Sequence, residues 1–397
     1  MYNNLLISLL ALLLVSAPTF AQTTAKQGSN KLTINRAKTL DFNPDMVKLL
    51  EVPKGWEVSI AASGLGKPRM LYMGADGELY ITRRDPGDVL MLKDKDGDHK
   101  FEEQATIVSD FKGVHGITIK DGWMYLCNNS ILRRYKMNND GSLSVLETLM
   151  DDLPAAGQHP NRTIDFGPDG MLYLSVGSAC NACTEPEELA TILQVDPKTW
   201  KRTVYAAGLR NTIGFDWHPT TGELWGLDNG GDGKGNDWPP EELNRLIKGG
   251  HYGFPLAYGK KVADKTFKDP PGTTKEAFVN TTQASVLEMQ AHMAPIAFQF
   301  FNHVKNIPAE YNNDGLVCWH GSWNRKKSVG YKVQRIKFKN GVAVGIEDFV
   351  TGFLRPGTGR KQKHFGRPAG LTITPAGIVF ISDDANGVLY AVKRSTK

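Results

Sequence analysis

The chain contains few cysteines, with four in 397 residues, at Cys127, Cys180, Cys183 and Cys318. No second pair of Cys or His ligands stands at a spacing like that of Cys180 and Cys183, which argues against a zinc site. The motif Cys-x-x-Cys-His, which attaches c-type haem, is absent. We therefore expect Cys180 and Cys183 to form a local disulfide in an oxidising compartment. A redox or metal-binding role is the less favoured alternative.

The chain also lacks an apolar run of the roughly 20 residues that a membrane-spanning helix needs. Its N-terminal apolar run, residues 5–15, has the length of a signal-peptide core and is followed by Pro18 and Ala21. We expect a signal peptide over residues 1–21 and a flexible polar leader over residues 22–42. The expected location is periplasmic or secreted, with no membrane span.

Basic residues do not gather in a block. The net charge is +5, from 47 basic and 42 acidic residues. Nucleic-acid binding normally needs a basic patch or stripe, so the sequence gives no support for a nucleic-acid partner.

What the chain does have is an internal repeat of short β-hairpins. Each copy has two segments of alternating apolar and polar residues around a turn such as Asp-Gly. The copies lie at residues 70–82, 115–129, 162–178, 214–229, 295–322 and 370–387. A hairpin that recurs about every 50 residues is typical of a β-propeller, whose blades have about four strands each. The sequence therefore predicts an all-β fold, a six-bladed β-propeller of four-stranded antiparallel blades, as a single domain over residues 43–397.

The copies are unevenly spaced, which predicts long insertions at residues 229–290 and 331–364. Within the first insertion, residues 240–247 and 285–293 are expected to form short helices. Substrate specificity is expected to lie in these insertions, because ligands of such folds usually bind where loops converge.

Charged side chains stand at or just before the first strand of four copies. They are His115, His159 with Arg162, Arg210, and Arg367. The innermost strands of a propeller line its central channel, so we expect these side chains to converge. Residues 208–255 combine Arg210 with a loop rich in glycine and carboxylates, and we expect them to form one part of the site.

Several motifs in this order resemble one known family. They are GLRNTIGFDWHP from residue 208, GELWGLDNGGDG from 222, CWHGSWNRKKSVGYKV from 318, and FGRPAGL from 365. From about residue 43 onwards the chain resembles the soluble glucose dehydrogenase and L-sorbosone dehydrogenase family, six-bladed propellers that carry pyrroloquinoline quinone (PQQ). The resemblance implies an exported dehydrogenase that oxidises a sugar or a sugar-derived aldehyde by hydride transfer to PQQ.

The resemblance also implies roles for individual residues. His159 matches the catalytic base, a role that imidazole fills well near neutral pH. Arg210 matches the cation that stabilises charge on the quinone oxygen. PQQ carries carboxylates, for which guanidinium groups are good partners. The cofactor-binding candidates are Arg367, Arg325 or Lys326, and additionally Arg162.

Calcium is the second cofactor that the resemblance implies. In the family a Ca²⁺ ion bridges protein carbonyls to PQQ, and the matching positions are Gly230 and Gly231. Asp228 and Glu242 are nearby carboxylates that can complete the ligand shell. Residues 94–98 begin like a calcium loop, but no Glu stands at its twelfth position. We interpret residues 94–98 as a hairpin turn, with a structural Ca²⁺ site as the alternative.

One departure from the family pattern concerns the group that orients His159. The glucose-oxidising members place an Asp after the strand that follows the base, whereas residues 175–180 here contain no carboxylate. Asp165 is a candidate substitute. The departure favours the sorbosone-like branch over glucose as substrate.

Two alternatives remain open at the level of the sequence. The first is a Ca²⁺-dependent propeller hydrolase of the lactonase kind, with Asn211, Asn229 and Asp228 as ligands. The second is a non-catalytic propeller that binds a carbohydrate or a protein. If the chain is a dehydrogenase, electrons must leave to a separate acceptor, a cytochrome or a quinone, because no haem motif is present.

Overall fold

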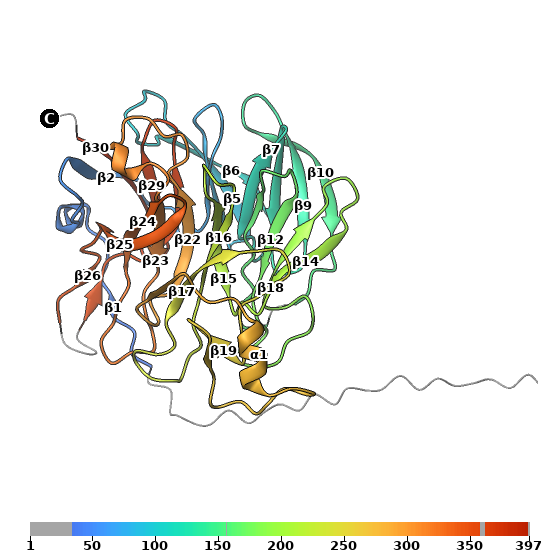
Figure 1. Ribbon diagram of the computed structural model, residues 1–397. Coiled ribbons are helices and arrows are strands. Elements are labelled where there is room, and N and C mark those ends of the chain that lie inside the picture. Colours follow the sequence, from blue (N-terminus) through green and yellow to red (C-terminus); the bar gives the residue numbers. More distant parts are fainter. Residues whose placement is uncertain (1–33, 156, 358–361, 396–397) are drawn as a thin grey trace, which may run out of the picture.

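The computed structural model describes residues 34–155, 157–357 and 362–395. The predicted signal peptide and leader residues 22–33 lie outside this range. Strands dominate the described chain (Figure 1). Its helical segments are α1 (Lys275–Thr281) and the short 3-10 helices η1 (Pro44–Leu49) and η2 (Ala309–Tyr311). The described residues contain no helix that is both long and apolar enough to cross a membrane.

The larger sheets of the described chain have four or five strands each. In the first three they are β3 (Leu71–Met73), β4 (Leu79–Arg83), β5 (Asp88–Lys93) and β6 (Glu103–Val108); β7 (Gly116–Lys120), β8 (Trp123–Cys127), β9 (Leu132–Met137) and β10 (Leu143–Met150); and β11 (Ile164–Phe166), β12 (Leu172–Val176), β13 (Thr191–Val195), β14 (Arg202–Ala207) and β18 (Gly250–His251).

In the other three they are β15 (Thr212–Trp217), β16 (Leu224–Asp228), β17 (Glu241–Leu246) and β21 (Leu287–Met289); β22 (Pro295–Phe300), β23 (Gly315–Trp319), β24 (Lys332–Lys339) and β25 (Val342–Val350); and β28 (Pro368–Ile373), β29 (Val379–Asp383), β30 (Val388–Arg394) and β2 (Trp56–Ala62). Within these six sheets neighbouring strands are antiparallel, except that β18 joins β14 in parallel. Smaller pairings join β1 (Lys38–Thr39), β27 (Lys363–His364) and β26 (Leu354–Arg355), and β19 (Ala257–Tyr258) with β20 (Val262–Ala263).

Every predicted hairpin forms the first two strands of one sheet, including the degenerate copy at residues 295–322, which gives β22 and β23. The turn glycines explain why the chain reverses there: Gly77 and Gly377 both have φ of 92°, a region that side chains with a Cβ rarely adopt. The hairpin repeat and the four-stranded antiparallel sheets are thus confirmed.

The first strands of the sheets contact one another in a closed cycle. β3 contacts β7, β7 contacts β11, β15 contacts β22, β22 contacts β28, and β28 returns to β3; β12 and β15 join the third and fourth sheets. Burial decreases outward: all residues of β12 and β13 are buried, whereas four of six residues of β6 and four of eight residues of β10 are exposed. Apolar residues on both faces of the inner strands therefore form cores between neighbouring sheets.

The last sheet joins an early and a late segment of the described chain, because β2 pairs with β30 (Figure 1). Trp56, at the start of β2, packs against Tyr311 and Phe349 of the fifth sheet at ring-centroid distances of 5.3 and 5.1 Å. Burying an aromatic side chain of this kind stabilises a fold by about 1.5–3 kcal/mol or more. The N-terminal strand therefore links the last sheet to its neighbour.

One predicted boundary and two predicted helices differ from the structure. Residues 34–42, assigned to the leader, are packed: Asn35 and Ala37 are buried, and β1 pairs with β27. The packed chain thus begins before residue 43. The helices predicted at residues 240–247 and 285–293 are wrong, because these segments form β17 and β21. Its acidic residues made the first segment resemble an exposed helix. In the structure Glu241 and Glu242 are buried on β17, which lies between β16 and β21.

Candidate active site

Strand register brings the predicted site residues to one end of the sheets. Thr212, the first residue of β15, pairs with Asp228, the last residue of β16, so Arg210 lies at this end. In the neighbouring sheet Ser178 follows β12, and its amide donates to the carbonyl of Arg210 at 2.8 Å. A cavity of about 1090 Å³ opens here, and His159, Arg210 and Gly230 line it.

The insertion between β17 and β22 forms another wall of this cavity. Its residues 262–267 line the cavity opposite the strand ends, together with Tyr258 and Trp238. Figure 1 shows α1 and β19, parts of the same insertion, beyond one end of the sheets. Lys234 also lines the cavity and forms an ion pair with Asp264. The insertion therefore helps to enclose the cavity.

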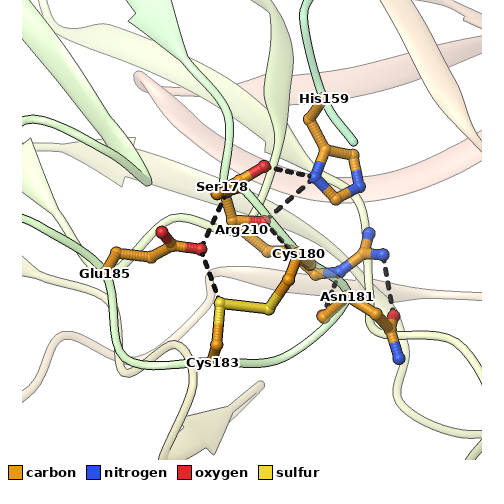
Figure 2. Close-up of a disulfide and its surroundings, with 8 residues drawn as sticks. His159, Ser178, Cys180, Asn181, Cys183, Glu185 and Arg210 are labelled. Carbon is orange, nitrogen blue, oxygen red and sulfur yellow. Dashed lines mark hydrogen bonds between the residues drawn. A yellow bond between two sulfur atoms is a disulfide. The ribbon is translucent and has the colours of Figure 1, made fainter. Parts of the chain in front are cut away.

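His159 is fixed by Ser178 (Figure 2). Its Nδ1 lies 2.8 Å from the Ser178 carbonyl oxygen and 3.0 Å from the Ser178 hydroxyl. A carbonyl can only accept a hydrogen bond, so Nδ1 carries the proton and Nε2 keeps its lone pair. Burial, and then the charge of Arg210, lower the pKa of His159 to about 4. His159 is therefore neutral near pH 7, with the tautomer that a base acting through Nε2 requires.

Asp165, the sequence-based candidate for orienting His159, instead forms hydrogen bonds with Thr118 and Phe166. Its Oδ1 accepts hydrogen bonds from the Thr118 hydroxyl at 2.7 Å and from the Phe166 amide at 2.8 Å. Asp165 thus joins β11 to β7, and this alternative was wrong. The Ser178 contact was missed because a backbone carbonyl leaves no signal in a sequence.

The Arg210 guanidinium is held on several sides. Its Nε donates to the Asn181 carbonyl at 2.8 Å, and its Nη2 donates to Asn181 Oδ1 at 2.9 Å and to Asp232 at 3.1 Å. Only 6% of its side chain is exposed. Such a group acts as a fixed positive charge, which stabilises charge in a reaction better than a mobile one.

Asp228 positions the backbone around Arg210. Its Oδ2 accepts from the Arg210 amide at 2.9 Å, and its Oδ1 accepts from the Asn211 amide at 2.7 Å and the Thr212 hydroxyl. Asp383 makes the same contact in the last sheet, where its Oδ1 accepts from the Arg367 amide at 2.8 Å. A carboxylate at the end of the second strand therefore fixes the arginine that precedes the first strand.

The four predicted metal-binding residues lie together. Asp228, Gly230, Gly231 and Glu242 all line a second cavity of about 30 Å³ beside the first. A Cβ on Gly230 would come within 2.8 Å of the Pro240 carbonyl, so the backbone passes there too closely for a larger residue. Burial, and then the charge of Asp228, raise the pKa of Glu242 to about 7. Two buried neighbouring carboxylates with backbone carbonyls form an oxygen-only donor set, which suits Ca²⁺.

Glu241, which sequence reasoning passed over, supports the same loop. Its Oε2 accepts from the Gly230 amide at 2.7 Å and its Oε1 from the Ala294 amide at 2.9 Å. Glu241 also lines the larger cavity. It was missed because its segment was predicted to be helical.

The four predicted cofactor-binding cations do not line the larger cavity. Arg162 is fully buried and donates to the carbonyls of His159 at 3.2 Å and Pro154 at 2.7 Å. It therefore supports the loop that carries His159. Arg325 is buried and paired with Asp237 at 2.7 Å, while Lys326 is exposed. Trp323 and Asn324, just before them, do line the cavity.

Arg367 belongs to a separate buried ionic cluster. Its Nε donates to the His320 carbonyl at 3.0 Å. His320 and Arg69 both contact Asp384, at 2.8 and 2.6 Å. The Arg367 Nη2 donates to the Gly321 carbonyl at 3.3 Å, two residues before Trp323. The expectation that Arg367 shares a cavity with His159 and Arg210 is therefore not met, although Arg367 lies next to a segment that does.

Two other predictions concern loops. The disulfide between Cys180 and Cys183 is confirmed, and Cys127 and Cys318 are buried free thiols. Residues 94–98 form an exposed turn between β5 and β6, with Asp94 accepting from the amides of Gly97 and His99. The segment thus forms a turn as predicted, and carboxylate oxygens of Asp94, Asp96, Asp98 and Glu102 lie within 4.8 Å of one another, so the alternative of a structural Ca²⁺ site stays a prediction.

The comparisons with known proteins agree with this architecture. An uncharacterized protein of Borreliella burgdorferi is 28% identical over 365 residues, which cover 88% of this chain and 92% of that protein. A pyrroloquinoline quinone-dependent sugar dehydrogenase of Hypocrea jecorina is 24% identical, covering 86% of this chain and 88% of that protein. The calcium structure of a Trichoderma reesei protein of Carbohydrate-Active Enzymes Family AA12 superposes with a TM-score of 0.74 at 22% identity, covering 92% and 99% of the two chains.

The solved structure shows that the two proteins share a fold, and the sugar dehydrogenase confirms the predicted resemblance to PQQ-dependent enzymes. The TrAA12-like family matches residues 50–395, nearly the whole described chain. The protein belongs to the TrAA12-like family.

Proposed function

We propose that this protein is a PQQ-dependent dehydrogenase that oxidises a sugar or a sugar-derived aldehyde hydrate. The observation that carries the proposal is the pairing of His159 and Arg210 in one cavity. A neutral imidazole with a fixed tautomer stands beside a fixed guanidinium. The imidazole can act as a general base, and the guanidinium can act as an electrostatic stabiliser.

In this proposal His159 Nε2 accepts the proton of the substrate hydroxyl, while Ser178 holds the ring through Nδ1. PQQ, when bound, supplies the acceptor for the hydride. Arg210 provides positive charge where negative charge develops, and its contacts with Asn181 and Asp232 keep it in place. The walls contributed by Trp323 and the insertion limit the access of water to the site.

The residues present fit a cofactor that carries carboxylates. Arg210 and Lys234 are cations in the cavity wall. Arg367 remains our candidate for a third, because it contacts the segment that leads to Trp323. We no longer propose Arg162 as a cofactor-binding residue, because its guanidinium is fully buried against backbone carbonyls. Arg325 and Lys326 are proposed only as neighbours that shape the loop.

We further propose that the small cavity beside Gly230 holds Ca²⁺. Its donors would be carbonyl oxygens of Gly230 and Gly231 with the carboxylates of Asp228 and Glu242. The support is chemical: a divalent cation would offset the burial of the two carboxylates and the repulsion between them, and burial first and Asp228 second raise the pKa of Glu242.

On a larger scale we propose that the sheets are the six blades of one propeller. The closed cycle of contacts among the first strands supports this count. We also propose that the protein is exported to a periplasmic or secreted location and that its substrate is sorbosone-like. A separate cytochrome or quinone would accept the electrons. The replacement of the orienting Asp by Ser178 supports the branch assignment.

The experiment is reconstitution of the purified protein with PQQ, with and without Ca²⁺, followed by dye reduction over a panel of aldoses and sugar-derived aldehydes. We expect dye reduction that requires PQQ and is stronger with Ca²⁺. Absence of both PQQ binding and PQQ-dependent turnover would overturn the proposal.

The hydrolase alternative has less support. Asn229 uses its amide group to donate to the Asn211 and Pro295 carbonyls. Among the described residues, no cluster of three or more acidic, His or Cys ligands lies in the larger cavity. Lactone hydrolysis by the same protein preparation, without PQQ, is the result that would favour it.

A further inference from the structure

A disulfide-closed loop contacts both reacting side chains (Figure 2). Ser178, two residues before Cys180, accepts the hydrogen bond of His159 through its carbonyl at 2.8 Å. Asn181, inside the ring closed by Cys180 and Cys183, accepts from Arg210 through both its carbonyl and its side chain. The two contacts thus lie on either side of one half-cystine.

Besides the disulfide, hydrogen bonds to other segments hold the loop: Asn181 donates to the Asp232 carbonyl at 3.0 Å and its Oδ1 accepts from the Asp232 amide at 2.7 Å. The loop belongs to the connection between β12 and β13, residues 177–190, which contains no helix or strand. Its internal bonds are few: the Ser178 hydroxyl donates to the Cys180 carbonyl at 2.7 Å, and Glu185 accepts from the Ala179 amide at 2.8 Å. A cross-link in such a segment removes conformations that hydrogen bonds alone would leave accessible.

We propose that the Cys180–Cys183 disulfide holds Ser178 and Asn181 as positioning residues for His159 and Arg210, so that opening it lowers turnover. This inference rests on the proposed function. Ser178 takes the place of a carboxylate in fixing the imidazole, and the disulfide gives that neutral contact the rigidity it needs. A displacement of about 1 Å at a reacting group can cost about 10²-fold in rate.

The same arrangement makes the site sensitive to thiols. Both half-cystines are partly exposed, so a small dithiol can reach them. Its first thiolate attacks one sulfur and breaks the Cys180–Cys183 bond, and its second thiol closes the dithiol into a disulfide. The protein gains two electrons and two protons as two thiols, and the dithiol loses the same number.

The first test compares the full-length wild type with a Cys180→Ser/Cys183→Ser double variant, without cofactor, by ¹⁵N NMR of labelled histidine. His159 is assigned through a His159→Asn variant. We expect a single Nδ1-protonated tautomer in the wild type and a mixture of tautomers in the double variant. A Cys127→Ala variant serves as control, because Cys127 is a buried free thiol in the second sheet. A double variant with the wild-type tautomer contradicts the inference.

The second test measures turnover after PQQ loading. The wild type is reduced with dithiothreitol and freed of it by gel filtration before PQQ is added, because thiols react with quinones. We expect kcat to fall about 10- to 100-fold, to recover on reoxidation, and to be equally low in the untreated double variant. Unchanged kcat with intact folding, judged by circular dichroism, means that the disulfide is only a surface cross-link.

The two tests separate the claims. If no preparation turns over with PQQ, the proposed function fails, while the tautomer measurement still decides whether the loop positions His159.

Discussion

At the scale of single residues, the site depends on neutral contacts and backbone atoms as much as on charges. His159 is fixed by a carbonyl, and Arg210 by the carbonyl and amide of Asn181. The charged residues were visible in the sequence. Their partners were not, because Ser178 and Asn181 are ordinary loop residues until the fold brings them together. Sequence reasoning therefore named the charged residues that we propose to react and missed the residues that orient them.

The lowered pKa of His159 predicts the acid limit of activity. A base works when unprotonated, and a pKa of about 4 keeps it unprotonated well below the usual value of 6.5. We expect kcat/KM of the loaded enzyme to fall only as the pH approaches about 4. The measurement is a pH–rate profile at constant ionic strength. A fall centred near pH 6.5 would show that His159 is solvated or is not the base.

Arg210 should not tolerate lysine. An ammonium group cannot reproduce the two directed bonds to Asn181, so the positive charge would no longer be fixed. We expect Arg210→Lys to lower kcat about 10²-fold, the size typical for loss of one stabilising donor. Arg202→Lys is the matched control. Arg202 lies on the outer strand β14 and forms ion pairs with Glu188 and Asp152. Equal kcat in the two variants would argue against the role of Arg210.

At the scale of elements, the hairpins were predictable because their alternation is local, and their turns use glycine. The strands β17 and β21 were not, because pairing sets them rather than their own pattern: β17 pairs with β16, and β21 pairs with β17. Tertiary pairing decided the structure of these segments over local appearance. The same applies to residues 34–42, which pack against distant parts of the chain: Lys38 and Thr39 pair with residues 363–364, and Asn35 bonds to the Arg325 carbonyl.

Asp216 on β15 gives a prediction about stability. It is half-buried and accepts from the amides of Phe300 and Trp217 at 2.7 Å, yet desolvation of its carboxylate raises its pKa to about 7. A raised pKa in the folded state means that its contribution is full below about pH 4 and is lost as pH rises through 7.

We therefore expect the free energy of unfolding of the wild type, relative to Asp216→Asn, to decrease between pH 5 and pH 8. The slope should not exceed about 1.4 kcal/mol per pH unit. Chemical denaturation at the two pH values measures it. A difference that grows with pH would contradict the assignment.

At the scale of the whole molecule, closure of the ring depends on the N-terminal strand. β2 completes the sheet formed by β28, β29 and β30, so early and late segments of the described chain stabilise each other. The repeat predicted the number of hairpins, but the identity of the strand that closes the last sheet is a matter of topology. Such long-range pairing leaves no periodic signal in the sequence.

Trp56 tests this closure. Its side chain is 6% exposed and contacts Tyr311 and Phe349. We expect Trp56→Ala to lower the free energy of unfolding by about 3–5 kcal/mol, as large truncations in a core do. Val145→Ala, at a site 60% exposed on β10, should change it by less than about 0.5 kcal/mol. Similar values for the two variants would contradict a role for β2 in closure.

The most direct test of the central claim is a single turnover. Wild type and His159→Asn are loaded with equal amounts of PQQ and Ca²⁺, and reduction of the bound cofactor by a sugar is followed by absorbance in a stopped-flow instrument. His303→Asn, at an exposed histidine, is the matched control. We expect wild type and His303→Asn to reduce the cofactor equally fast and His159→Asn to be at least about 10²-fold slower. Equal rates in all three proteins would contradict this expectation.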